Sequence, residues 1–105
     1  MDPVIAPEQG KVRPAMVVSN DDLSIAASHL GTGMITVVPL TTNVRRILDF
    51  QVLVAPADTG LSVVSKAQPE QIRSISYSRI VRRIGGVDAE TLAAVDECLR
   101  IHLAL

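Results

Sequence analysis

Short apolar runs separated by polar turns predict a chain built mainly from strands. The strongest strand signal is MITVVPL at 34–40, which is rich in β-branched residues, and a shorter run of the same kind covers 15–19. Residues 1–12 hold two of the six prolines and are predicted to be a loop. The remaining strand candidates are the apolar runs at 50–54, 61–66 and 71–76.

A helical pattern closes the chain. Asp88 is a good N-cap residue, and Glu90 in the first turn is favoured by the helix dipole. Apolar residues then recur at helical spacing along one face, at Leu92, Val95, Leu99 and Leu103. This pattern predicts a packed helix that runs to the C-terminus. A short helical piece is expected around 77–81, and 23–30 could form about two helical turns or a long excursion.

These elements predict one domain over residues 1–105, without repeats or linkers. The fold class is mostly β with α, a small barrel or half-barrel of five to six short, mainly antiparallel strands plus a C-terminal helix. A chain of this length buries about 60 to 70% of the surface that its unfolded form exposes, which allows one modest core.

Composition excludes two common routes to nucleic-acid binding. Phe50 and Tyr77 are the only aromatic residues, so no stacking platform for bases can form. The formal net charge of -1 argues against binding through bulk positive charge. Any nucleic-acid contact must therefore be local, made by cations that converge on one face from among Lys11, Arg13, Arg45, Arg46, Lys66 and Arg73.

Other site classes find little support. Cys98 is the only cysteine, so an intrachain disulfide is ruled out. We expect Cys98 to be a small buried side chain of the terminal helix. His29 and His102 have no partner at metal-ligand spacing, so no metal site or cofactor is expected. No apolar run approaches the roughly 20 residues of a membrane span, and no leader pattern begins the chain, so a soluble cytoplasmic protein is expected.

Arg13 carries the sharpest chemical signal. It follows a glycine-containing loop and precedes Pro14, which biases the arginine backbone to extended geometry at the mouth of the 15–19 strand. A guanidinium held there is the kind of fixed cation that handles a phosphate. The alternative is an ordinary solvated arginine at the start of a strand.

Two further groups of polar residues follow apolar strands. Thr41 or Thr42 places a hydroxyl where the 34–40 strand reaches the surface. That hydroxyl could donate a hydrogen bond to a phosphate oxygen, or it could only satisfy a backbone group of a turn. Gln71 and Arg73 are predicted to share one strand face at period two, while Glu70 and Arg73 could be only an exposed ion pair. Arg45 and Arg46, in a polar loop, could grip a phosphate or be solvated.

Three segments in register carry a family resemblance: EQGKVRPAMVVSND at 8–21, VVPLTTN at 37–43 and EQIRSIS at 70–76. With the amphipathic helix, residues 8–105 resemble a MazF/PemK-type toxin, the ribonuclease half of a toxin-antitoxin pair. The resemblance implies a homodimer of small SH3-like barrels that cleaves single-stranded RNA at short sequence motifs without a metal. The substrate would be messenger RNA, or ribosomal or transfer RNA, and a cognate antitoxin would hold the toxin inactive.

The resemblance also implies roles for single residues. Arg13 matches the family's catalytic arginine, and Thr41 rather than Thr42 matches its active-site threonine. The RNA-binding positions are matched by Glu8, Gln9, Gly10 and Lys11 in the loop before the arginine, and by Glu70, Gln71 and Arg73. Metal-free cleavage uses the RNA 2′-hydroxyl as nucleophile and needs charge stabilisation, which suits a guanidinium. Arginine stays protonated and is a poor base, so Glu70 is the nearby candidate for that role.

The beginning of the chain departs from the family. Members begin with a strand of the type RGEIWxVDL, whereas this chain starts MDPVIAPEQG. We therefore expect Met1 to be an internal start and the authentic protein to carry roughly a dozen more residues; without them the barrel would lack a strand and leave an unpaired edge.

Two other classes of function stay open at this point. One is a non-catalytic or decayed family member that binds protein, either as a gyrase inhibitor or by sequestering antitoxin. The other is a small barrel adaptor with no nucleic-acid role. The presence of both Arg13 and Thr41 favours the endoribonuclease, because a protein-binding module need not keep both.

Overall fold

A central eight-residue strand organises the molecule. The computed structural model describes residues 3–8, 11–18, 30, 33–57 and 59–105. Their elements, in chain order, are β1 (Pro3–Glu8), β2 (Lys11–Val17), β3 (Met34–Thr41), β4 (Val52–Val54), β5 (Ser65–Ala67), the 3₁₀ turn η1 (Pro69–Gln71), β6 (Arg73–Ser76), the 3₁₀ turn η2 (Tyr77–Arg79), β7 (Arg82–Arg83) and the helix α2 (Ala89–Leu103). The predicted segment 23–29 lies outside the described residues.

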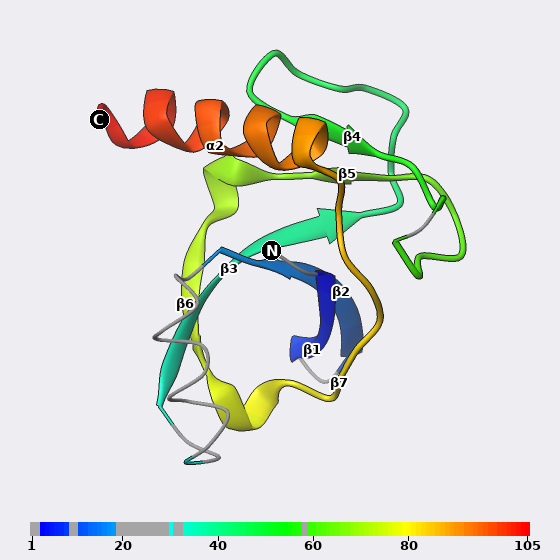
Figure 1. The fold of residues 1–105 in the computed structure, drawn as a ribbon, viewed down its shortest axis with the longest axis vertical. Coiled ribbons are helices and arrows are strands. Elements are labelled where there is room, and N and C mark those ends of the chain that lie inside the picture. The colour runs from blue at the N-terminus through cyan, green and yellow to red at the C-terminus, as the bar shows by residue number, and fades with distance from the viewer. Residues whose placement is uncertain (1–2, 9–10, 19–29, 31–32, 58) are drawn as a thin grey trace.

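All strand pairs are antiparallel, and the sheet order is β4-β5-β3-β2-β1-β7, with β6 also paired to β3. β3 pairs with β6 over its first half, with β5 at its end and with β2 along its other edge. Figure 1 shows the sheet curling on itself with α2 lying along the side of β4 and β5. The described part of the chain thus has seven strands, one more than the upper sequence estimate.

Two core clusters occupy the opposite faces of the sheet. Side chains alternate along a strand, so neighbouring residues such as Val37 and Val38 enter different clusters. The first cluster is Ala15, Ile35, Val37 and Ile75. The second is Met16, Val38, Leu40, Val54, Ala67 and Val95, in which α2 contributes Val95. The helix therefore packs on one face of the sheet, while Val17, Tyr77 and Ile80 pack against the first cluster on the other face.

The predicted loop at 1–12 is wrong, because residues 3–8 form β1 and β2 already begins at Lys11. β1 pairs with β2 from Pro3↔Met16 to Glu8↔Lys11 and with β7 through Ile5↔Arg82. The prolines disguised the strand, yet proline is tolerated at a first strand position, and backbone pairing on both sides outweighs weak local propensity. The unpaired edge expected beside β2 is consequently filled by β1.

The predicted strand at 71–76 is confirmed over residues 73–76, which form β6, whereas the predicted beginning of this strand, at Gln71, belongs to the 3₁₀ turn η1. The N–H groups of Gln71 and Ile72 bond to the carbonyls of Gln68 and Pro69, 2.8 and 3.1 Å away. Pro69 suits this 3₁₀ turn because its ring sets the required backbone angle and it has no N–H to leave unpaired. The predicted run at 50–54 contracts to β4, and the run at 61–66 is replaced by the shorter β5, which begins at Ser65 and extends one residue beyond the predicted end.

The C-terminal helix forms as predicted, with Asp88 as its N-cap. Val95 is fully buried and Leu99 packs against the second cluster, whereas Leu103 is 47% exposed and Ile101 is 70% exposed. The prediction of a packed helix therefore holds for its first turns and is wrong for its last, which extends past the sheet (Figure 1). Cys98 is half-buried rather than buried.

We expect Asp88→Ala to lower the thermal unfolding midpoint at neutral pH. The backbone N–H of Thr91 donates to the Asp88 carboxylate at 2.7 Å, and this bond holds the pKa of Asp88 below its ordinary value of 3.8. Because the pKa is lowered in the folded state, the stabilisation is present above pH 3.8 and is lost as the pH falls through the folded-state value.

The measurement is thermal unfolding of both proteins between pH 7 and 2, in which the two midpoints should converge at the acid end. Asp96→Ala, an exposed carboxylate in the same helix that caps nothing, is the control and should not lower the midpoint. A difference for Asp88→Ala that stays constant down to pH 2 would contradict the capping account.

Candidate functional site

Arg13, near the start of β2, and Thr41, at the end of β3, lie on the same face of the sheet. β2 and β3 pair Val17 with Val37 and Ala15 with Pro39. Arg13 lies two residues before Ala15 on β2 and Thr41 two residues after Pro39 on β3, so in this antiparallel pair both lie beyond the same end of the paired region. Both share the face of the first core cluster, away from α2. Arg13 is exposed and Thr41 is half-buried, so a ligand on this face would reach both.

The Thr41 side chain begins a turn and keeps a donor. Its Oγ1 accepts a hydrogen bond from the backbone N–H of Asn43 at 3.2 Å. A hydroxyl has one donor and two acceptor sites, so this contact leaves the O–H to donate elsewhere. The two interpretations of Thr41, a turn residue and a phosphate donor, are therefore compatible.

Two more cations share this face. Thr41 pairs directly with Lys66 of β5, and Val37 pairs directly with Arg73 of β6, and cross-strand partners point to the same side. Arg73 is exposed, and the Lys66 ammonium donates to the backbone carbonyl of Arg46 at 2.7 Å. The sequence alone places Lys66 only among six cations that could converge on one face, because its pairing with Thr41 depends on which strands are neighbours.

The prediction that Gln71 and Arg73 share a strand face at period two is wrong. Gln71 is the last residue of η1, while Arg73 is the first of β6. The 3₁₀ turn that begins at Pro69 breaks the extended geometry on which the period depends. Both side chains are exposed, so each can still contact a ligand.

Glu70 faces a polar neighbour inside the fold. Its Oε2 accepts from Nε2 of Gln51 at 2.8 Å, and its Oε1 is buried without a hydrogen-bond partner among the described residues.

Burial, together with the charges of Glu97 and Glu70, raises the pKa of the Cys98 thiol. The thiolate is therefore disfavoured at Cys98, and its chemistry is that of a packing residue.

Of the predicted RNA-binding positions before Arg13, the structure describes Glu8, the last residue of β1, and Lys11, the first residue of β2. Glu8 and Lys11 are the last paired positions of these two strands, while Gln9 and Gly10 lie outside the described residues. Lys11 is two residues from Arg13 on β2, and Glu8 pairs with Lys11, so these two positions lie at the same end of the β1–β2 pair as Arg13.

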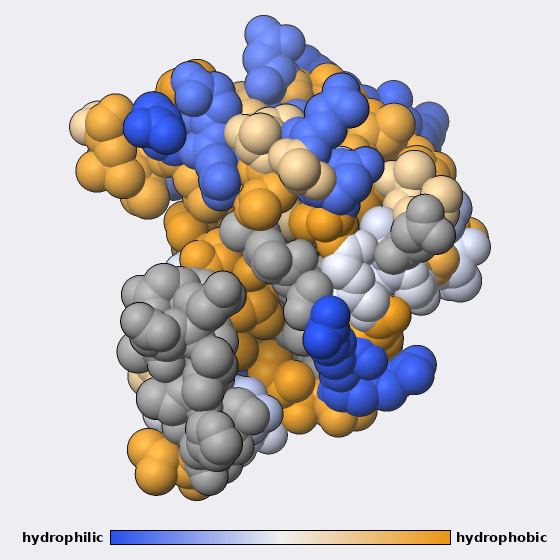
Figure 2. All heavy atoms as spheres, viewed as in Figure 1, coloured by the Kyte–Doolittle hydropathy of each residue, from blue (hydrophilic) through white to orange (hydrophobic). Residues whose placement is uncertain are grey.

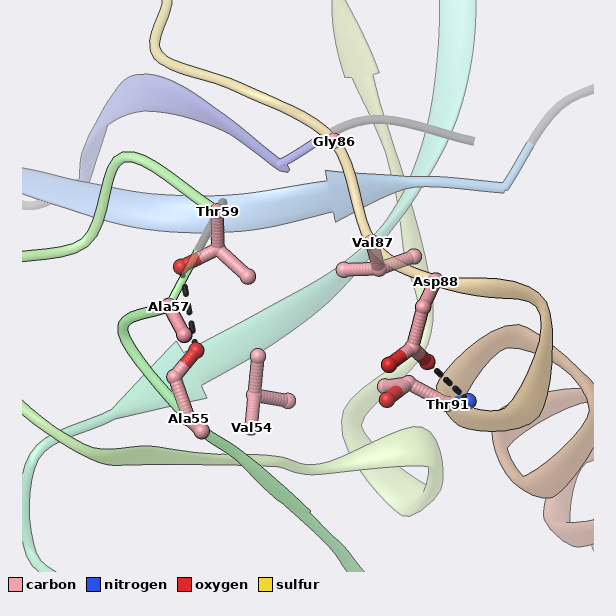
Figure 3. Close-up of a pocket in the computed structure, with 8 residues that line it drawn as sticks. All are labelled: Val54, Ala55, Ala57, Thr59, Gly86, Val87, Asp88 and Thr91. Atoms are coloured by element: carbon pink, nitrogen blue, oxygen red, sulfur yellow. Dashed lines mark hydrogen bonds between the residues drawn. The ribbon is translucent and has the colours of Figure 1, made fainter.

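Two of the hollows among the described residues lie away from Arg13 and Thr41. One, of about 420 Å³, lies between the segment after β4 and the start of α2, and Figure 3 shows its polar side chains turned to local partners: Thr59 to the Ala55 carbonyl and Asp88 to Thr91. The other, of about 280 Å³, includes Pro14, which alternates along β2 to the opposite face from Arg13, and Thr42, the first residue after β3. Neither hollow contains a predicted catalytic residue.

The described residues contain no helix long and apolar enough to cross a membrane. Within the same residues, no group of three histidine, cysteine or acidic side chains is placed to hold a metal ion.

Comparison with known proteins identifies the relatives of this arrangement. A family model described as the PemK-like, MazF-like toxin of type II toxin-antitoxin systems matches residues 1–103. Endoribonuclease MazF9 of Mycobacterium tuberculosis is 50% identical over 105 residues, which are 100% of this chain and 89% of that protein. Endoribonuclease EndoA of Bacillus subtilis is 33% identical over 106 residues, covering 100% of this chain and 87% of that protein.

Solved structures agree with the sequence match. The Mycobacterium tuberculosis toxin MazF-mt6 superposes with a TM-score of 0.82 at 26% identity, covering 100% of this chain and 98% of that chain. MazE-MazF (Form-II) from Deinococcus radiodurans superposes with a TM-score of 0.76 at 28% identity, covering 99% of this chain and 92% of that chain.

Proposed function

Because this chain belongs to the family of PemK-like, MazF-like toxins of type II toxin-antitoxin systems, we propose that it is a sequence-specific endoribonuclease that cleaves single-stranded RNA without a metal. The observation that supports the proposal is the antiparallel register of β2 and β3, in which Arg13 and Thr41 both lie beyond the same end of the paired region and on the face of the sheet opposite to α2. The relatives named as endoribonucleases favour this function over a non-catalytic protein-binding module.

In the proposed reaction the RNA supplies its own nucleophile. The 2′-oxygen attacks the adjacent phosphorus, the bond from phosphorus to the 5′-oxygen breaks, and a 2′,3′-cyclic phosphate forms. A base takes the 2′-hydroxyl proton, and the departing 5′-oxygen gains a proton. Arg13 donates paired N–H groups to the non-bridging oxygens as the five-coordinate phosphorus develops, and Thr41 hydrogen-bonds the same phosphate.

Glu70 stays the proposed base, with a constraint from its surroundings. Gln51 holds Oε2 and Oε1 is buried, so a basic role requires the Glu70 side chain to move out of this position. The turn η1 also contacts α2, so that movement has to bring the carboxylate round to the face of the sheet that carries Arg13. The proposed RNA path continues over Glu8, Gln9, Gly10 and Lys11 before Arg13, and over Gln71 and Arg73 on the β6 side.

The proposed partners are a second copy of this chain and a cognate antitoxin in the cytoplasm. Apolar side chains at the end of α2 support a protein contact there, with Ile101 70% and Leu105 83% exposed. Figure 2 shows apolar residues gathered at this end of the molecule. One of the similar solved structures, from Deinococcus radiodurans, is of MazE-MazF, that is, of MazF with a second protein.

The test incubates the purified full chain with a long single-stranded RNA in EDTA and maps the cuts. We expect cleavage at a short recurring sequence, with 2′,3′-cyclic phosphate ends. The matched control is the same RNA carrying a single 2′-deoxynucleotide before the cut, which lacks the nucleophile and should remain intact there. Intact RNA with a folded protein, or cutting of the deoxy substrate at the same bond, would overturn the proposal.

A further inference from the structure

The loop between β3 and β4 is tied to the rest of the fold by side chains at both ends. It leaves β3 after Thr41 and arches back to β4 (Figure 1). Near its start, Asn43 N–H donates to Thr41 Oγ1, and Arg45 N–H donates to Asn43 Oδ1 at 3.4 Å. At its end, Leu48 N–H donates to Gln51 Oε1 at 3.1 Å, and Gln51 in turn bonds Glu70.

Lys66 provides the contact in the middle of the loop. Its Nζ donates to the backbone carbonyl of Arg46 at 2.7 Å, a short charge-assisted hydrogen bond that joins positions 20 residues apart. Lys66 lies between Thr41 and Leu53 in the sheet, with a direct cross-strand partner on each side. Its neighbours Ser65 and Ala67 are buried, so the lysine backbone is firmly placed.

The anchored section of the loop displays two cations. Arg45 and Arg46 are both exposed, and the Lys66 bond holds the backbone at Arg46. Guanidinium groups bind phosphate oxygens well. Because the loop backbone at these arginines is already held before the RNA binds, less conformational freedom is lost on binding. The loop begins at Thr41, so these cations would meet phosphates next to the one being cleaved.

We propose that Lys66 is a positioning residue that fixes the β3–β4 loop so that Arg45 and Arg46 bind the RNA backbone beside the scissile phosphate. The inference rests on the proposed ribonuclease function. It assigns Lys66 to substrate affinity and to the choice of flanking nucleotides, and leaves the chemical step to Arg13 and Thr41. A lysine that itself contacted the scissile phosphate would instead affect the turnover rate.

The first test is Lys66→Met, which keeps the length of the side chain and removes the donor. We expect KM for a short RNA with one cut site to rise about tenfold, because the RNA would then have to order the two arginine side chains on binding, and a cost of that kind corresponds to a change of about this size. We expect kcat to stay within about twofold of wild type. Lys66→Arg keeps a donor and should stay within about threefold of wild type in KM. Arg100→Met also removes one positive charge, from an exposed position of α2, and should leave both constants unchanged.

The second test is a double-mutant cycle with Arg45→Met/Arg46→Met. If Lys66 acts by placing those two side chains, Lys66→Met should add less than about twofold to KM in that background. Amide hydrogen exchange over 43–48 should be faster in Lys66→Met than in wild type or Arg100→Met. Circular dichroism and the melting midpoint show that each variant is folded.

A Lys66→Met enzyme with wild-type KM, a loss confined to kcat, or a full tenfold effect that persists without Arg45 and Arg46 would overturn the inference. These outcomes are separate from failure of the proposed function, which would appear as uncut RNA with the wild-type protein.

Discussion

Replacing Arg13 with alanine should lower kcat for RNA cleavage by about 10²- to 10³-fold, the usual loss when one electrostatic donor to a developing oxyanion is removed. Arg13 is exposed near the start of β2, so its removal deletes no core contact and the protein should remain folded. The measurement is single-turnover cleavage of a short RNA in EDTA, which separates the chemical step from binding and release.

Two variants sharpen the Arg13 result. Arg13→Lys keeps the charge but not the paired donors, and should recover only part of the lost rate because an ammonium cannot bind two phosphate oxygens in the same plane. Arg100→Ala removes a guanidinium from α2 and should cleave at the wild-type rate. An Arg13→Ala protein that retained wild-type kcat would exclude Arg13 from the chemical step.

Gly60→Ala should destabilise the fold by about 2 to 4 kcal/mol, the sum of a left-handed backbone penalty and an overpacked contact. Gly60 has φ of +81°, and a Cβ built there would overlap the carbonyl oxygen of Ile84. A Cβ on Gly85 would meet the carbonyl of Thr59 in the same way, so the segment after β4 and the segment before α2 touch backbone to backbone.

Thermal unfolding followed by circular dichroism measures this effect. For a domain of this size the loss corresponds to a midpoint lower by roughly 10 to 25 °C. Ser62→Ala, an exposed position two residues along the same loop, should change stability by less than about 0.5 kcal/mol. A Gly60→Ala protein as stable as Ser62→Ala would show that these two backbone segments can separate at little cost.

Local chemistry explains which elements could be predicted. β3 has a β-branched run long enough to be recognised without neighbours, and α2 has both a capping aspartate and helical spacing. The sequence-based prediction missed β1 because Pro3 and Pro7 are typical of loops, whereas this extended segment is stabilised by its pairing with β2 and β7. The last turn of α2 was misjudged because apolar spacing indicates which face is apolar without indicating how far the covering sheet extends.

The candidate site divides in the same way. Arg13 and Thr41 could be found from their motifs, since each directly adjoins a recognisable apolar strand. Lys66 could not, because a lysine between two small residues has no distinguishing local pattern. The period-two relation between Gln71 and Arg73 was lost to a 3₁₀ turn, which local sequence alone did not reveal.

By itself, the sequence determined the class of fold, the family resemblance and the chemical types available for RNA cleavage, because propensity and motif order act over a few residues. Only the tertiary structure decided that β1 closes the sheet beside β2, that α2 packs on the face of the sheet opposite to Arg13, and that Lys66 lies opposite Thr41 with its ammonium on the Arg46 carbonyl. Those relations depend on strand register between segments far apart in the chain, and register is set by pairing and burial together.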